Sequence, residues 1–329
     1  MKERGLGGPQ GPPLTFRQSA AVLSCAAALL ITGCFAHQYR HNPRIAVVDG
    51  DPIVQMKPRG EMPSVQRPTL VEAENHSDPP DEGDRVLGLV FGTEARAYPI
   101  GLLDRFEVVN DVSGEIPFVV VRCALTGIAA AFDRRAEDRT LTFENSGALW
   151  RDTLVLRDRE TGTYWSAATG RALSGELEGR EMRAIPVALT RDELWRKAHP
   201  ESLYLDLGRS TAVPFAMRLY EASPAQGVSG LRTDDRRFKP KEEVVVVGDG
   251  REAVAFRAKE LRHNRTVVVP LDGRPIAIEW DPALQTPRAY QTGAESREMP
   301  LLSMYWFAVG RHFKKVRPWP EKASPRAPN

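Results

Sequence analysis

The stretch Ile116-Pro-Phe-Val-Val-Val-Arg-Cys-Ala-Leu-Thr-Gly127 decides the fold that we expect for this chain. Its run of β-branched and aromatic residues predicts a strand, which ends at Cys123 and leads into a turn at Thr126 and Gly127. A turn at the end of a strand can present a side chain to a cleft, whereas the strand itself packs in the core. Cys123 is therefore the first candidate for a functional residue.

Strand patterns continue on both sides of this stretch, with few and short helices between them. Strands are predicted over residues 86–91, 95–98, 107–109, 129–132, 140–143, 153–156 and 164–166, and helices over 100–106 and after Thr190. Thr190 and Glu193 have the spacing of a capping box, which favours a helix start there. Residues 206–240 carry turn formers without periodicity and are expected to form a long connection.

Residues 244–291 repeat the pattern of residues 86–133 at a constant spacing (244 − 86 = 158). The valine run at 244–247 corresponds to the first strand, and Pro275 corresponds to Pro117. Several matches in one register indicate two copies of one supersecondary unit. We therefore expect a mainly β fold with short helices, a β-rich α+β protein, in which two related halves form one compact body.

Cys123 corresponds to Asp281 in this register. A buried aspartate is costly without a partner, so Asp281 suggests a position that is partly open or that has a partner such as Arg288. If that openness is shared by both copies, the thiol of Cys123 is accessible. One copy would then serve as scaffold while the other carries the site.

The composition is that of an ordinary globular protein. The chain has 329 residues, of which 42% are hydrophobic and 27% charged, with a formal net charge of +2. There is no basic stripe and no nucleic-acid-binding motif, so nucleic acid is not an expected partner. Metal-binding spacings and nucleotide fingerprints are also missing, so we expect no metal and no cofactor.

The N-terminus has the features of a secretory lipoprotein signal over residues 1–33. Basic residues precede an uncharged run from Ser19 to Ile31, and the ending Ile31-Thr-Gly-Cys34 resembles the lipobox of bacterial lipoproteins. Cys34 would then carry the lipid and hold the protein on a bacterial membrane in the cell envelope, facing the periplasm or the exterior. The alternative is an uncleaved anchor, because the run of about 18 residues is at the lower limit for a spanning helix.

The rest of the chain divides into three parts. Residues 34–83 contain many prolines and are expected to be a tether, residues 84–319 the folded domain, and residues 320–329 a disordered tail. Cys25 would leave with the signal, so Cys123 has no partner for an internal disulfide. A lone thiol in an oxidising compartment is buried, protected or functional.

These motifs together resemble the bacterial and archaeal family called domain of unknown function 3179, over roughly residues 84–319. The residues that carry the resemblance are Arg96-Ala-Tyr-Pro99, Glu107-Val-Val-Asn-Asp111, Cys123-Ala-Leu-Thr-Gly127, Phe143-Glu-Asn-Ser-Gly147, Asp158-Arg-Glu-Thr161, Trp165-Ser166, Thr169-Gly170, Gly175, Gly179, His199-Pro200 and Tyr305-Trp-Phe-Ala308. The family usually has proline after the cysteine and often a second cysteine nearby, where this chain has Ala124 and Thr126. The activity of the family is unassigned, so the resemblance implies an architecture and candidate positions.

Two sets of residues are candidates for chemistry. Cys123 is a candidate nucleophile with His199 as its base, although a small buried hydrophobe is the alternative at a strand end. The candidates for ligand binding are Arg96, Tyr98, Glu107, Asn110, Asp111, Thr126, Ser146 and Trp165. Their alternative role is structural, because Asn and Asp form turns and aromatic residues pack in cores.

Three functions remain open from the sequence. The first is an extracytoplasmic lipoprotein that binds a small ligand in a cleft near Cys123. The second is a cysteine-dependent enzyme or redox protein that uses Cys123 with His199. The third is a structural or assembly lipoprotein without a small-molecule site. Convergence of Cys123, His199 and Asp111 on one cleft would favour the enzyme.

Overall fold

The fold was analysed in a computed structural model, which describes residues 36–248, 252–264, 266–293 and 296–320. It is mainly β with short helices, as the sequence predicts. The first half begins with β4 (Arg85–Phe91), β5 (Glu94–Pro99), α2 (Ile100–Phe106), β6 (Val108–Ser113), β7 (Ile116–Cys123) and β8 (Ile128–Asp133). The second begins with β18 (Glu243–Gly248), β19 (Glu252–Phe256), α5 (Ala258–Asn264), β20 (Thr266–Leu271), β21 (Arg274–Asp281) and β22 (Thr286–Gln291).

The strand pairings recur between these two series with the spacing found in the sequence. Leu87 pairs with Tyr98 in the first series, and Val245 pairs with Phe256 in the second (245 − 87 = 158; 256 − 98 = 158). The two other hairpins of each series repeat in the same way. Superposition of the two segments stays a prediction of the sequence, and the order and register of their strands agree with it.

The correspondence continues into a strand–helix–strand segment in each half. In the first half this segment is β16 (Ala188–Arg191), α3 (Asp192–Ala198) and β17 (Leu203–Asp206); in the second it is β24 (Leu302–Tyr305), α6 (Trp306–His312) and β25 (Lys315–Trp319). β17 pairs in parallel with β5, and β25 pairs in parallel with β19. The spacing here is 114 residues (306 − 192 = 114), so the first half contains 44 extra residues (158 − 114 = 44) before this segment.

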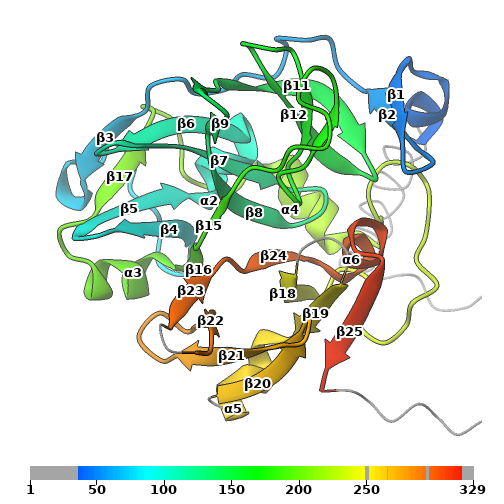
Figure 1. The fold of residues 1–329 in the computed structure, drawn as a ribbon. Coiled ribbons are helices and arrows are strands. Elements are labelled where there is room, and N and C mark those ends of the chain that lie inside the picture. The colour runs from blue at the N-terminus through cyan, green and yellow to red at the C-terminus, as the bar shows by residue number, and fades with distance from the viewer. Residues whose placement is uncertain (1–35, 249–251, 265, 294–295, 321–329) are drawn as a thin grey trace, which may run out of the picture.

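The extra residues of the first half form further strands. They are β9 (Arg135–Ala136), β10 (Arg139–Thr140), β11 (Phe143–Trp150), β12 (Thr153–Asp158), β13 (Tyr164–Ser166), β14 (Ala172–Ser174) and β15 (Ala184–Ile185). Four of them join two N-terminal strands in a sheet of order β1-β2-β11-β12-β13-β14. This layer lies at the top of the first half (Figure 1).

The prediction of a tether over residues 34–83 is wrong for most of that segment. A helical segment over 36–41 leads to β1 (Arg44–Val48), β2 (Asp51–Gln55), β3 (Thr69–Glu72) and η1 (Ala73–Asn75). Asp49 and Gly50 both have positive φ (51° and 85°), as a two-residue hairpin turn requires. The scattered prolines hid this hairpin, whose partner, β11, is 93 to 97 residues away along the chain (148 − 55 = 93; 150 − 53 = 97).

An eight-stranded sheet joins the two halves. Its path is β25-β19-β18-β24-β8-β7-β6, with β15 paired to β8. The two halves meet where Ser303 of β24 pairs with Ala129 of β8. The other sheets are β16-β4-β5-β17-β3 in the first half and β20-β21-β22 with β23 (Arg297–Met299) in the second. Figure 1 shows the first half above the second, with β24 at their boundary.

Several sequence predictions concern residues that lie outside the described segments. Cys25, Cys34 and residues 321–329 lie outside them, so the predicted signal, lipidation and tail stay predictions. Within the part that the structure describes, no helix has both the length and the apolar character needed to cross a bilayer. The long connection after β17 is largely irregular and contains α4 (Phe215–Ala222).

Candidate functional site

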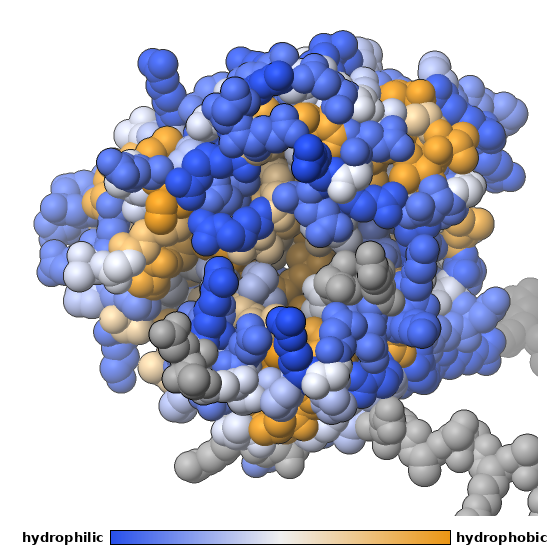
Figure 2. Space-filling view, in the orientation of Figure 1, coloured by the Kyte–Doolittle hydropathy of each residue, from blue (hydrophilic) through white to orange (hydrophobic). Residues whose placement is uncertain are grey.

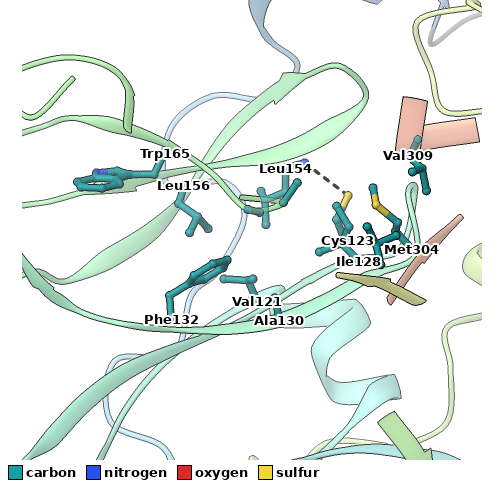
Figure 3. Packing of buried hydrophobic residues seen from close by; sticks show 14 of the residues in the cluster. Val121, Cys123, Ile128, Ala130, Phe132, Leu154, Leu156, Trp165, Met304 and Val309 are labelled. Atoms are coloured by element: carbon teal, nitrogen blue, oxygen red, sulfur yellow. Dashed lines mark hydrogen bonds between the residues drawn. The ribbon is translucent and has the colours of Figure 1, made fainter. Parts of the chain in front are cut away.

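Cys123 lies in the hydrophobic core, not in a cleft. Its exposed fraction is 1%, and it packs among Val121, Ile128, Leu154, Met304 and Val309 (Figure 3). The backbone N–H of Leu154 donates to its Sγ atom at 3.5 Å. The expectation of an accessible thiol is therefore wrong.

The turn after Cys123 is covered by elements from distant parts of the chain. The hydroxyl of Tyr220, on α4, donates to the carbonyl of Leu125 at 2.6 Å. The backbone N–H of Tyr305 donates to the carbonyl of Thr126 at 2.8 Å. The long connection and the end of β24 thus close a turn that the local sequence suggested would be open.

Burial sets the protonation state of the thiol. The loss of hydration raises the pKa of Cys123, and the nearby Glu107 carboxyl raises it further. A reactive cysteine needs the opposite shift, because the thiolate is the nucleophile. The site therefore has the properties of a structural cysteine.

We expect the thiol of Cys123 to react with a maleimide only after denaturation. The measurement is mass-spectrometric labelling of the full chain at neutral pH, with and without urea. A Cys123→Ser variant is the control that assigns the label. Labelling of the native protein within minutes would contradict the burial described above.

His199 lies in a different environment from Cys123. It follows the last residue of α3, and its ring centroid is 4.2 Å from that of Trp195. Burial and the nearby Arg288 cation lower its pKa. Within the described residues, the neighbours of His199 include Trp195 and Ser202, whereas Cys123 packs in a separate core cluster, so the structure does not bring the predicted pair together.

The helix before His199 does not begin with the predicted capping box. α3 starts at Asp192 without a side-chain cap. The hydroxyl of Thr190 instead donates to the carbonyl of Leu284 in the second half. Thr190 therefore links the halves, which local spacing did not indicate.

Three of the predicted ligand-binding residues converge in one buried cluster. Arg96 Nη1 lies 2.6 Å from Asp111 Oδ2, and the hydroxyl of Tyr98 donates to the same oxygen at 2.5 Å. Burial, and then the negative charge of Asp111, raise the pKa of Tyr98 well above its ordinary value. The guanidinium of Arg96 also contacts Glu94. The charges of Arg96, Asp111 and Glu94 attract one another, so their arrangement stabilises the junction of β5 and β6.

Glu107 belongs to a second polar cluster, next to β7, where the backbone N–H of Arg122 donates to its carbonyl at 2.8 Å. The side chain of Asn145 donates to Glu107 Oε2 at 2.6 Å, and Arg122 Nε donates to Asp104 Oδ1 at 2.8 Å. Burial raises the pKa of Glu107 to about 7; the hydrogen bond from Asn145 opposes this shift, and the charge of Asp104 adds to it. Glu107 is thus the carboxyl of this cluster that titrates near neutral pH.

The contribution of Glu107 to the stability of the protein should fall as pH rises towards 8. Its folded pKa of about 7 lies above the ordinary value of 4.5, so its contribution is complete below pH 4.5 and is lost as pH rises through 7. Relative to Glu107→Gln, which does not titrate, the wild type should lose on the order of 3 kcal/mol between pH 4.5 and 8. Urea unfolding of both proteins at several pH values measures this difference. Parallel curves would contradict the shifted pKa.

The remaining predicted ligand-binding residues also have internal partners. Asn110 exchanges hydrogen bonds with the backbone of Phe143, and Trp165 Nε1 donates to Asp158. The hydroxyl of Ser146 donates to the carbonyl of Val155 at 2.5 Å. These residues hold strands and turns together.

Thr126 is linked to a buried histidine by a short chain of polar atoms. Its Oγ1 lies 3.4 Å from Thr153 Oγ1, which in turn lies 2.7 Å from His312 Nε2. Burial, with the positive charge of Arg151, lowers the pKa of His312 to about 3, so this ring is neutral at physiological pH. No cavity described below opens onto this chain of contacts.

The described cavities lie between the halves, and none of the predicted catalytic or ligand-binding residues lines them. There are three cavities, of about 240, 190 and 530 Å³, and the second shares wall residues with each of the other two. Ala184, Ile185 and Pro300 line both the second and the third, and Leu301 lines both the first and the second. We call these three cavities the inter-half groove. Figure 2 shows a hollow in the middle of the molecule, apolar inside and hydrophilic around its rim.

The largest cavity of the groove is apolar with basic residues at its rim. Val90 is 48% exposed there, and Phe91 and Met299 also line it. Arg183, Arg297 and Glu298 also line it, and Arg183 pairs with Asp133 at 2.8 Å, whereas Glu298 pairs with Arg288 at 2.7 Å. Such a surface suits a ligand with an apolar body and a polar or anionic group.

One feature of the sequence could have indicated the groove. Arg85 and Glu243 are equivalent positions of the repeat (243 − 85 = 158), and they carry opposite charges. In the structure they form a two-point ion pair across the first cavity, with both N–O distances 2.9 Å. An ion pair between equivalent positions indicates that the two copies face each other at this point.

Among the residues that the structure describes, no group of three His, Cys, Asp or Glu side chains is placed to hold a metal ion. A family model described as "Protein of unknown function (DUF3179)" matches residues 59–316. Neither curated proteins nor solved structures yielded a match. The matched region begins within the segment that the sequence suggested was a tether, in agreement with its folded strands.

Proposed function

We propose that this chain, which belongs to the DUF3179 family, is an envelope lipoprotein that binds a small ligand in the inter-half groove. The observation that carries the proposal is the position and size of the groove. Ligand sites favour the junction of two structural units, and the largest cavity, about 530 Å³, lies within the usual range of about 300–1,000 Å³.

This proposal moves the ligand away from Cys123. The sequence suggested a cleft at that residue, but Cys123 lines none of the described cavities. The enzyme hypothesis loses support because the thiol is buried and His199 has other neighbours. The structural or assembly hypothesis is distinguished from binding by the experiment below.

Ligand binding is tested by thermal unfolding of the full chain in detergent micelles, followed by tryptophan fluorescence. The probes are a panel of amino acids, short carboxylic acids, amides and monosaccharides. A ligand present at a hundred times its Kd adds about 2.7 kcal/mol to the stability, or roughly 5 °C in Tm. Ala184 is half-buried and lines two of the cavities, so a tryptophan at this position should fill part of both. Ala184→Trp should therefore abolish the ligand-induced rise in Tm.

The matched control is Ala46→Trp, at a half-buried alanine of β1 outside the groove, which should keep the shift. If no member of the panel shifts Tm, or if both tryptophan variants retain the same shift, the groove is not a ligand site. The structural or assembly role would then be the better account.

Lipid anchoring is tested at Cys34. Because the apolar run ends in Thr-Gly-Cys, Cys34→Ala should block processing or release the protein from membranes. The measurement is membrane fractionation with gel mobility, and Cys25→Ala, within the predicted signal, is the control that should behave as wild type. A Cys34→Ala protein that stays membrane-bound with unchanged mobility would favour a spanning anchor.

A further inference from the structure

The cavity of about 240 Å³ has a different wall from the rest of the groove. Part of it is apolar, formed by residues such as Leu189, Pro287 and Leu301. The other part is polar and comes from both halves: Arg85 and Thr190 from the first, Arg262, Thr286 and Ser303 from the second. A mixed wall of this kind suits an organic molecule with one polar end.

Ser303 provides the first sign of a missing partner. It is 8% exposed, and its hydroxyl has no hydrogen-bond partner within the described part of the chain. An unpaired buried hydroxyl is costly, so such groups usually have a partner. Rotation about χ1 gives the hydroxyl three staggered positions. A ligand in the cavity that Ser303 lines would give the hydroxyl a hydrogen-bond partner.

The charges of this cavity provide the second sign. Glu243 is neutralised by its two-point ion pair with Arg85, and Arg191 pairs with Glu193 at 2.8 Å. Arg262 is exposed, its guanidinium carbon lies 5.4 Å from the ring centroid of Trp280, and no ion pair involving it is found among the described residues. The cavity therefore has a net positive charge, carried by Arg262.

We propose that this cavity binds the carboxylate of a small organic acid, with Arg262 and Ser303 holding the carboxylate and the apolar wall holding the body. The inference rests on the proposed function and names the ligand class for one part of the inter-half groove. Arginine is well suited to a planar carboxylate, because its fork of N–H donors can bind both oxygens. An inorganic anion has no body to occupy the apolar part of the wall.

The test compares matched probes on the full chain in detergent micelles, at constant ionic strength. The carboxylates are butanoate and benzoate, the neutral controls are butanamide and benzamide, and the inorganic control is phosphate. We expect the carboxylates to raise Tm, and the amides and phosphate to leave it unchanged. Isothermal titration calorimetry then gives the Kd of the better carboxylate.

Two substitutions test the assigned residues. Arg262→Gln should weaken carboxylate binding about tenfold or more, whereas Arg274→Gln, at an exposed position of β21 outside the cavity, should not. Ser303→Ala should weaken binding and leave the Tm of the unliganded protein equal or higher, because it removes an unpaired hydroxyl. A lower Tm with unchanged binding would assign Ser303 a structural role and overturn its part in the site.

The outcomes separate this inference from the proposed function. If amides bind as tightly as carboxylates, if phosphate binds equally well, or if Arg262→Gln binds normally, the carboxylate inference is overturned while the groove remains a ligand site. If no probe of either panel binds, both proposals fail.

Discussion

Replacing Arg122 by methionine is expected to lower the free energy of unfolding by about 3–5 kcal/mol. The side chains of Arg122 and Asp104 are 1% and 0% exposed, and their closest charged atoms are 2.8 Å apart. Burial disfavours the charged form of Arg122, but the negative charge of the adjacent Asp104 outweighs this effect and keeps the pKa of Arg122 above its ordinary value. Without Arg122, the carboxylate of Asp104 would be buried without a counter-charge, beside Glu107.

Urea unfolding of the full chain measures this effect, with two controls. The double variant Arg122→Met with Asp104→Leu should recover most of the loss, because it leaves no unpaired charge. Glu61→Gln breaks an exposed ion pair, whose Lys57 and Glu61 side chains are 51% and 45% exposed, and should cost less than about 1 kcal/mol. If Arg122→Met costs no more than Glu61→Gln, the buried pair is not the determinant that we describe.

Replacing Asp152 by alanine is expected to cost about 3 kcal/mol or more. This carboxylate is fully buried, and it accepts hydrogen bonds from the backbone N–H groups of Val228 and Ser229 at 2.6 and 2.7 Å. The hydroxyl of Ser229 also donates to it at 2.6 Å, and Arg311 of α6 forms an ion pair with it. Asp152 therefore holds the long connection against the body of the protein.

Loss of this anchor should also uncover Cys123. The same connection carries Tyr220, whose hydroxyl covers the turn after Cys123. Maleimide labelling of Cys123 should therefore become faster in Asp152→Ala under native conditions. Asp234→Ala, at an exposed position of the same connection, is the control. It should change stability by less than about 1 kcal/mol and leave the labelling rate unchanged. Equal labelling of both variants would show that another element protects the thiol.

Local patterns predicted most strands of the repeated halves and their short helix. The helix predicted over 100–106 is α2 (Ile100–Phe106), and the predicted strand before Cys123 is β7. Strand formation follows from β-branched residues and turn glycines within a few positions, so the sequence alone suffices. The 158-residue spacing was visible for the same reason, because it compares local patterns.

The N-terminal strands could not be predicted in the same way. β1 and β2 are rich in valine and isoleucine, but prolines before and within the hairpin favoured an extended tether. β2 is held by β11, whose Trp150 pairs with Ile53. A strand whose partner lies 93 to 97 residues away has no local signature of that pairing.

The candidate site shows the same division. The sequence identified Arg96 and Asp111 as candidate residues, because both belong to recognisable motifs, but neither their ion pair nor their burial was predictable from it. The groove was missed, because its walls come from segments more than 100 residues apart, as Thr190 and Ser303 do.

By itself, then, the sequence of this protein determined the strands, the turns and the repeated pattern, since these depend on neighbours along the chain. Only the tertiary structure decided which side chains are exposed to solvent and which are buried. Cys123 is buried because α4 and β24 cover its turn, and the inter-half groove exists because two distant halves pack without filling the space between them. Burial and cavities depend on what lies opposite a residue in space, which no local pattern of residues specifies.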